Sequence, residues 1–225
     1  MNSANLSYLS TQLESENTKD RMLALAALQH VPAADALPLI KKVLDDESLQ
    51  IRAMAIFALG IKQTDECYPL LLDILTNEKD YSIRATAAGA LGYLQDPRAF
   101  EPLVRTLYED TDWLVRFSAA VSLGNLKDPR AYDALIQALD SQEVVLQQAA
   151  ISALGEIKAV QAVEHILRFV QSEDWLVRQR VAEALGQLPS AKSLSALRYL
   201  EKDSHTQVAQ AASYAIQQLL DQPGS

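Results

Sequence analysis

Apolar and polar residues recur along this chain with a period of 31 or 32 positions. Each repeat aligns on a basic position, with a small residue three places later and a large aliphatic residue seven places later. The residues at the basic position are Arg21, Arg52, Arg84, Arg116, Gln147, Arg178 and Ala209. The apolar residues around this position have the spacing of one helix face. Self-similarity at such a period indicates a repeat protein.

The pattern predicts two helices in each repeat. The second helix begins at a polar capping residue four places before the basic position. The strongest of these caps are Asn17, Ser48, Asp80, Asp112 and Asp174. A glycine follows the aliphatic position in five repeats, and we expect it to end the second helix in a left-handed conformation. These glycines are Gly60, Gly92, Gly124, Gly155 and Gly186.

The predicted fold class is all-α, a right-handed α-solenoid of about seven helix pairs. Small alanines three places after the basic position let second helices of neighbouring repeats approach closely, so that the pairs share one core. We expect a single repeat domain over residues 1–225. Its repeats span roughly residues 4–31, 32–62, 63–94, 95–126, 127–157, 158–188 and 189–220.

Composition and charge narrow the function. The net charge of −9 argues against nucleic-acid binding, which needs a basic surface. No stretch is long and apolar enough for a membrane span, and the first residues lack a signal-peptide pattern. One cysteine, Cys67, excludes an internal disulfide. We therefore expect a cytoplasmic protein.

The fourth repeat carries a recognisable motif. Its residues Val115-Arg116-x-x-Ala119-x-x-Ser122-Leu123-Gly124-x-Leu126-x-Asp128-Pro129-Arg130-Ala131 resemble the HEAT-like repeat of the phycobilisome lyase family. Within it, the segment 112–118 looks most like proteins of cyanobacterial phycobilisome degradation. Their relatives attach or remove phycocyanobilin on phycobiliprotein cysteines. The resemblance implies phycobiliprotein subunits as partners and phycocyanobilin as a ligand rather than a resident cofactor.

The resemblance also places the second helices on the concave side of a solenoid. Side chains one and five places after the basic position then line a groove. Apolar and small residues fill it in repeats two to four, notably Phe57, Gly89, Phe117 and Val121. Such a groove suits a partner helix or a flat bilin. The alternative is that these side chains fold back into the core. Arg180, farther along, is a candidate for a bilin carboxylate.

A second candidate surface is a row of aromatic residues directly after the capping position. Tyr81, Trp113 and Trp175 share this place, and such residues concentrate binding energy. The alternative is a hydrophobic staple that packs back onto its own repeat.

The basic residues also have acidic neighbours, six positions earlier in the sequence. We expect these pairs to brace adjacent repeats. The pairs are Asp46 with Arg52, Glu78 with Arg84, and Asp110 with Arg116.

The sequence identifies no catalytic residues and no metal site. His30, His165 and His205 lie in different repeats without metal-ligand spacing, and no phosphate-binding loop is present. The leading hypothesis is a binding protein, at most weakly catalytic, that docks on phycobiliproteins and promotes phycobilisome disassembly or bilin detachment. The alternatives are a subunit of a phycocyanobilin lyase and a general HEAT scaffold for protein interactions.

Overall fold

The computed structural model describes residues 3–221, and all regular secondary structure in that range is helical. The α-helices are α1 (Ser3–Leu13), α2 (Thr18–Ala27), α3 (Ala33–Lys41), α4 (Leu49–Lys62), α5 (Cys67–Asn77), α6 (Tyr81–Leu94), α7 (Phe100–Glu109), α8 (Trp113–Asn125), α9 (Tyr132–Ala138), α10 (Val144–Glu156), α11 (Val163–Leu167), α12 (Trp175–Gly186), α13 (Ala191–Leu200) and α14 (Thr206–Asp221). Short 3-10 helices are η1 (Leu28–His30), η2 (Pro97–Ala99), η3 (Pro129–Ala131) and η4 (Val160–Ala162). This confirms the predicted α-solenoid of about seven helix pairs.

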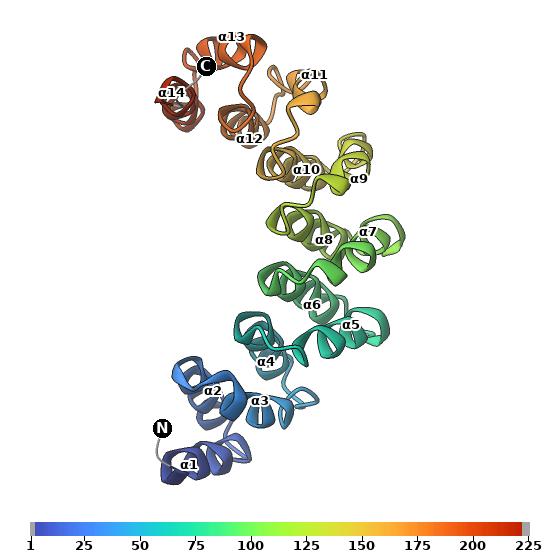
Figure 1. Ribbon diagram of the computed structural model, residues 1–225, viewed down its shortest axis with the longest axis vertical. Helices are drawn as coiled ribbons and strands as arrows, with labels where there is room; N and C mark the ends of the chain where they lie inside the picture. Colours follow the sequence, from blue (N-terminus) through green and yellow to red (C-terminus); the bar gives the residue numbers. More distant parts are fainter. Residues whose placement is uncertain (1–2, 222–225) are drawn as a thin grey trace. The chain divides into compact units, whose positions relative to one another are not determined.

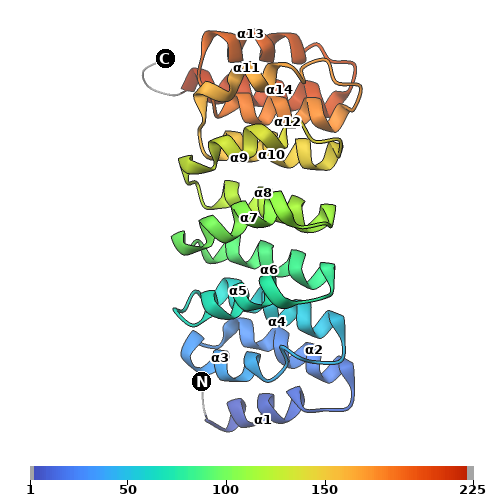
Figure 2. The ribbon, with the colours of Figure 1, turned by 90° about the vertical axis from the view of Figure 1, so that its right-hand side faces the viewer.

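The chain divides into two compact parts, an N-terminal part of residues 1–99 and a C-terminal part of residues 100–225. Each part has two layers of helices (Figures 1 and 2). In the N-terminal part, α2, α4 and α6 pack side by side in one layer, and α3 and α5 belong to the second layer, which packs against the first. In the C-terminal part, α8, α10, α12 and α14 form one layer, and α7, α9, α11 and α13 form the other.

The even-numbered helices are the second helices of the repeats. That one domain spans all seven repeats stays a prediction. No helix within residues 3–221 has both the length and the apolar character that crossing a membrane would require.

The core consists of the repeated apolar positions of the second helices. The leucine seven places after the basic position is fully buried in six repeats: Leu28, Leu59, Leu91, Leu123, Leu154 and Leu185. The alanines three places after the basic position are also buried, and they bring neighbouring second helices into contact. Both predictions from the spacing are confirmed. Burial of these side chains supplies most of the stabilisation of the stack.

Polar caps start most second helices. The side chains of Asn17, Asp80, Asp112 and Asp174 each accept a hydrogen bond from a backbone N–H in the first turn. Ser48 lies at the expected capping place, but its side chain makes no such bond. The predicted start is therefore confirmed in all five repeats, and the side-chain cap in four of them.

The expectation that glycine ends the second helix is wrong. Gly60, Gly124 and Gly155 lie inside their helices, and Gly186 is the last residue of α12. A Cβ on Gly60 would lie 2.7 Å from the Ala90 carbonyl oxygen, on the neighbouring second helix. Glycine is therefore needed for close approach of two backbones rather than for its conformation.

The left-handed residues come three places after the glycine, in four repeats. None of them is a glycine, and their φ angles lie between 48° and 55°. They are Gln63, Gln95, Lys127 and Lys158.

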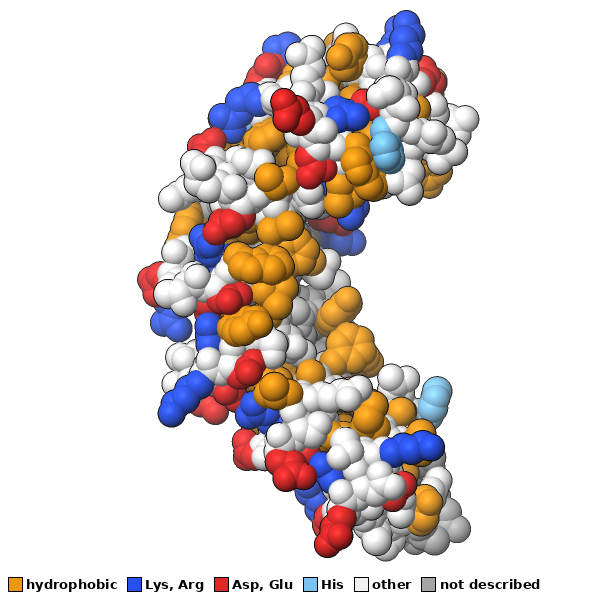
Figure 3. Space-filling model, turned by 180° about the vertical axis from the view of Figure 1, so that it is seen from behind, with side chains coloured by type: hydrophobic (Ala, Val, Ile, Leu, Met, Phe, Trp, Pro, Cys, Tyr) orange, Lys and Arg blue, Asp and Glu red, His pale blue; other side chains and the backbone are white. Residues whose placement is uncertain are grey.

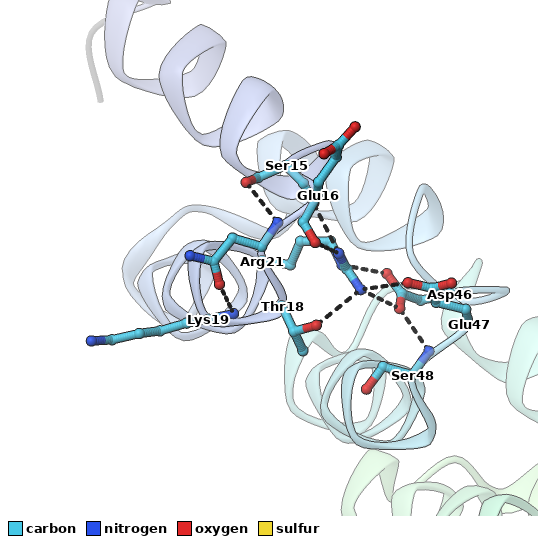
Figure 4. A network of polar contacts seen from close by, with 9 residues as sticks. Ser15, Glu16, Thr18, Lys19, Arg21, Asp46, Glu47 and Ser48 are labelled. Atoms are coloured by element: carbon cyan, nitrogen blue, oxygen red, sulfur yellow. Dashed lines mark hydrogen bonds and ion pairs between the residues drawn. The ribbon is translucent and has the colours of Figure 1, made fainter.

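The basic residues brace adjacent repeats, but Asp46 and Glu78 pair with the arginine of the preceding repeat, not with the arginine six places later as predicted. Arg21 pairs with Asp46 of the following repeat, and its Nη2 donates to Asp46 Oδ1 at 3.1 Å (Figure 4). Its Nη1 donates to the carbonyl oxygens of Ser15 at 2.8 Å and Glu16 at 3.2 Å, in the turn before α2. One guanidinium thus fixes its own turn and the next one.

The same arrangement recurs along the chain. Arg52 pairs with Glu78 at 3.0 Å, and Arg116 pairs with Glu143 at 2.5 Å. Arg178 meets Asp203 through two contacts, Nε to Oδ2 at 2.7 Å and Nη2 to Oδ1 at 2.9 Å. In each pair the acid belongs to the following repeat. The residue six places earlier supplies a backbone carbonyl to Arg84 and to Arg178, from Glu78 and Ser172 respectively.

Candidate functional site

Exposed apolar side chains gather on the second helices of the N-terminal part. Phe57 on α4 is 41% exposed, and its ring meets that of Tyr93 on α6 edge-on at 5.6 Å. Ile61 lies one turn after Phe57 on α4 and is exposed, as are Tyr93 and Leu23 on α2. Gly89 is half-buried, and a Cβ there would meet nothing within 4 Å. We name Leu23, Phe57, Ile61 and Tyr93 the apolar face.

Of the apolar face, the sequence reasoning found Phe57 and missed Leu23, Ile61 and Tyr93. Ile61 and Tyr93 both lie nine places after the basic position. All five other repeats place a polar residue there: His30, Asn125, Glu156, Gln187 and Gln218. That contrast is the signal that could have identified the pair, because an apolar residue at a position that tolerates glutamate is not there to complete a core.

The C-terminal part carries Phe117 and Val121 on α8. Val121 is exposed and Phe117 is half-buried. Their equivalents on α10 and α12 are polar, as predicted. The single groove that joins these residues to Phe57 and Gly89 stays a prediction, because its residues are divided between the two parts of the chain.

Arg180 on α12 has a partner within its own helix. Its Nη1 donates to Glu183 Oε2 at 2.7 Å, and the amide of Gln179 donates to the other carboxylate oxygen at 2.8 Å. Helix α10 packs against both α8 and α12, so it separates Arg180 from Phe117 and Val121. The predicted role of Arg180 toward a ligand carboxylate remains a prediction, and such a ligand would have to compete with Glu183.

The predicted aromatic row is exposed in both parts. Tyr81 opens α6 in the N-terminal part, and Trp113 and Trp175 open α8 and α12 in the C-terminal part. Trp175 stacks on His205, with ring centroids 4.1 Å apart and planes 11° from parallel. Leu49 at the start of α4 and Val144 at the start of α10 are exposed at the same repeat position. Sequence reasoning missed both because it considered only aromatic residues.

Hydrogen bonds lower the pKa values of several carboxyl groups in the turns before and after this row. Hydrogen bonding to Arg178 lowers the pKa of the Asp203 carboxyl below its ordinary value of 3.8. The hydroxyl of Ser141, and after it Arg116, lower the pKa of Glu143. The backbone N–H of Asp80 lowers the pKa of Glu78. These carboxylates therefore stay ionised in the folded chain under mildly acidic conditions.

The described residues offer little for chemistry. Cys67 is fully buried, with its Sγ 3.1 Å from the hydroxyl of Thr64. No group of three or more potential metal ligands comes together within residues 3–221. A cleft of about 440 Å³ in the N-terminal part has no histidine or cysteine in its lining, which consists of Leu44, apolar residues of α4, α5 and α6, and the polar residues Lys41, Asp45, Asp73, Asn77 and Glu78. The arrangement therefore suits binding, and the structure adds no catalytic candidate.

Several known structures are similar to this chain. The complex of CpcE and CpcF of phycocyanin lyase from Nostoc sp. PCC7120 is similar, with 28% sequence identity and a TM-score of 0.64. The match covers 78% of this chain and 73% of that one. No curated protein matches the sequence.

Two further structures show the fold alone. A structure of Kap95p with RanGDP is 15% identical with a TM-score of 0.64, covering 96% of this chain and 35% of that one. An engineered protein is 21% identical with a TM-score of 0.58, covering 96% of this chain and 68% of that one.

The family itself is shown by the sequence. The model for HEAT repeats matches residues 6–77, 68–146 and 132–217, which together span nearly all of the described chain. This agrees with the helix pairs, the buried leucines and the arginine ladder, which consists of the arginines that each pair with an acid of the following repeat. The chain belongs to the HEAT-repeat family.

Proposed function

We propose that this protein is a phycobiliprotein-binding HEAT protein of the cytoplasm. The observation that carries the proposal is the likeness to the CpcE–CpcF complex, which extends over most of both chains at 28% identity. That complex belongs to phycocyanin lyase. The exposed apolar face provides a surface on which helices of a phycobiliprotein subunit can pack.

The finer proposal is a role in phycobilisome disassembly or bilin detachment, like that of the degradation protein NblB. The resemblance of residues 112–118 supports it. The second candidate is a subunit of a phycocyanobilin lyase, which the CpcE–CpcF likeness favours. Both act on the same partner, and neither needs a nucleophile from this chain if the protein holds the chromophore in a reactive geometry.

Mixing the purified protein with phycocyanin distinguishes docking alone from chemistry on the bilin. Co-elution without a spectral change supports docking. A loss or shift of visible absorbance supports chemistry on the bilin. No co-elution and no spectral change would refute the phycobiliprotein proposal and leave a general HEAT scaffold.

Variants test the exposed apolar side chains of both parts, the apolar face and Val121. Phe57→Ser with Val121→Ser changes one exposed side chain in each part, and Phe117 is kept because it is half-buried. We expect the affinity for phycocyanin to fall at least about tenfold, roughly 1.4 kcal/mol, with little change in the melting temperature. The matched control is Val160→Ser, a 43% exposed residue of η4 outside the second helices. Unchanged affinity of the double variant would exclude these faces as the docking site.

A further inference from the structure

Three apolar side chains form a row in the C-terminal part. Trp113, Val144 and Trp175 are the first residues of α8, α10 and α12, and they are 48%, 41% and 37% exposed. These helices pack side by side in that order. Packed helices lie about 8–10 Å apart, so the three side chains are spaced at roughly that interval along one edge. We name them the edge row.

Folding does not require large apolar residues at this position. The first and last repeats place Thr18 and Thr206 there, at the starts of α2 and α14. A side chain that packed as a staple onto its own repeat would be mostly covered. The edge row instead leaves between a third and a half of each side chain in water, and only Trp175 is stacked on a ring, that of His205. An exposed apolar row of this kind indicates a partner.

The turns that lead into the edge row are acidic. Residues 110–112, 139–143 and 168–174 contain six carboxylates and one basic residue, Arg168. The carboxylates are Asp110, Asp112, Asp140, Glu143, Glu173 and Asp174. On the face that Figure 3 presents, exposed hydrophobic side chains lie beside acidic ones.

The turns at the opposite ends of the second helices have the reverse balance. Residues 126–131 and 157–162 contain Lys127, Arg130 and Lys158 against Asp128. The negative charge of the C-terminal part is therefore concentrated beside the edge row and not spread evenly over its turns.

Internal pairs cancel part of this charge, and the Arg178 guanidinium, which pairs with Asp203, donates to the carbonyl oxygens of Ser172 and Glu173 in the third turn. Arg168 offsets Asp140 and Arg116 offsets Glu143. Asp112 and Asp174 accept backbone N–H groups at the starts of α8 and α12, and Glu173 is exposed. A basic segment that reaches the row would gain charge complementarity in addition to apolar contact.

We propose that the edge row docks a basic amphipathic helix of a partner protein. A helix rises 1.5 Å per residue, so apolar residues seven places apart are about 10.5 Å apart, close to the spacing of the row. Lysine or arginine residues on either side of that apolar stripe would face the acidic turns. The N-terminal part repeats the arrangement, with Leu49 after Asp45, Asp46 and Glu47. This surface is separate from the apolar face and does not depend on phycobiliprotein binding.

The chain contains two tryptophans, and both belong to the edge row. Tryptophan emission therefore reports directly on whether the row is occupied. The probe is a designed tryptophan-free peptide of roughly 21 residues, with leucine at every seventh place and lysine beside it. A matched peptide carries glutamate in place of lysine. We expect the lysine peptide to change the emission saturably, with an effect that weakens as salt is added, and the glutamate peptide to have no effect.

Val144→Glu tests the row without removing a fluorophore. Glutamate in the first turn of α10 suits the helix dipole, so the variant keeps its fold. We expect it to weaken peptide binding at least about tenfold, whereas Val160→Glu, at an equally exposed site on the opposite edge, leaves binding unchanged. Equal binding of both peptides, or equal effects of both variants, would refute the proposal. So would a concentration-dependent dimer whose formation changes the emission, because a second copy would then cover the row.

Different variants test the two proposals, so one proposal can be refuted while the other stands. Val144→Glu should still bind phycocyanin, and Phe57→Ser should still bind the lysine peptide.

Discussion

Two glycines of the N-terminal part allow one chemical change to be tested in opposite surroundings. Gly60 in α4 and Gly89 in α6 both lie within helices. An added Cβ on Gly60 would lie 2.7 Å from the Ala90 carbonyl oxygen and 2.9 Å from the Ala90 Cα, whereas one on Gly89 would meet nothing within 4 Å. Replacement by alanine therefore gives the same gain in helix propensity but a very different packing cost.

The expected signs follow from these two contributions. Alanine is favoured over glycine in a helix by about 1 kcal/mol, and at Gly89 nothing opposes that gain. At Gly60 the contact is with backbone, which cannot rotate away, so the helices must separate at an overpacking cost of about 1–3 kcal/mol or more. We expect Gly89→Ala to stabilise the protein by about 0.5–1 kcal/mol and Gly60→Ala to destabilise it by about 1–2 kcal/mol.

The assay is urea denaturation followed by helical circular dichroism, with parent and both variants at one protein concentration. The readout is the shift of the denaturation midpoint, which remains useful where a repeat protein departs from two-state unfolding. Stabilisation by Gly60→Ala would contradict the close-approach interpretation and restore the idea that this glycine serves as a helix terminator. Destabilisation by both would mean that the open space at Gly89 is filled by something else.

The arginine ladder gives two further predictions. Arg178→Ala should destabilise the protein by roughly 2–3 kcal/mol, because it leaves Asp203, whose side chain is 9% exposed, without the guanidinium that binds both its carboxylate oxygens. Arg180→Ala breaks a more exposed pair within α12 and should change the free energy of unfolding by less than about 0.5 kcal/mol. Equal urea midpoints of the two variants would contradict this. Asp203 has a lowered folded pKa, so its contribution to stability is present above the ordinary value of 3.8 and is lost as pH falls through the folded pKa. Asp203→Asn should therefore be less stable than the parent at neutral pH and lose less stability between about pH 5 and pH 2, as followed by urea midpoints across that range; parallel curves would exclude this contribution.

The sequence predicts the helix pairs and the core because both depend on local spacing. Leu123 is seven places after Arg116, two helical turns along the same second helix, and it is fully buried as expected. The ladder partners could not be predicted in the same way. Asp46 is six places before Arg52 and 25 places after Arg21, so a period of 31 makes both pairings equally consistent with the pattern. Only the packing of the turns decides between them.

The glycines illustrate a second limit. Glycine after the last buried leucine suits a left-handed helix end and suits a close helix contact equally well. The distinction depends on Ala90, which lies 30 residues after Gly60. Part of the candidate site was missed for a related reason, since Phe57 meets Tyr93 across two helices. The polar residues that other repeats place at the Tyr93 position were nevertheless visible in the sequence.

The contrast between repeat positions gives a physical reason to look for function at the apolar face. Seven places after the basic position, six repeats have leucine, because a sealed site accepts one shape. Five places after it, the repeats have Ala26, Phe57, Gly89, Val121, Ser152, Glu183 and Tyr214. A position that accommodates glycine, glutamate and phenylalanine in one architecture is not specified by the packing of the stack. Leaving an aromatic ring such as that of Phe57 partly in water forgoes about 25 cal/mol for each Å² of apolar surface, and only a partner that covers the ring recovers that free energy. The choice of side chain at such positions is therefore best explained by what binds there.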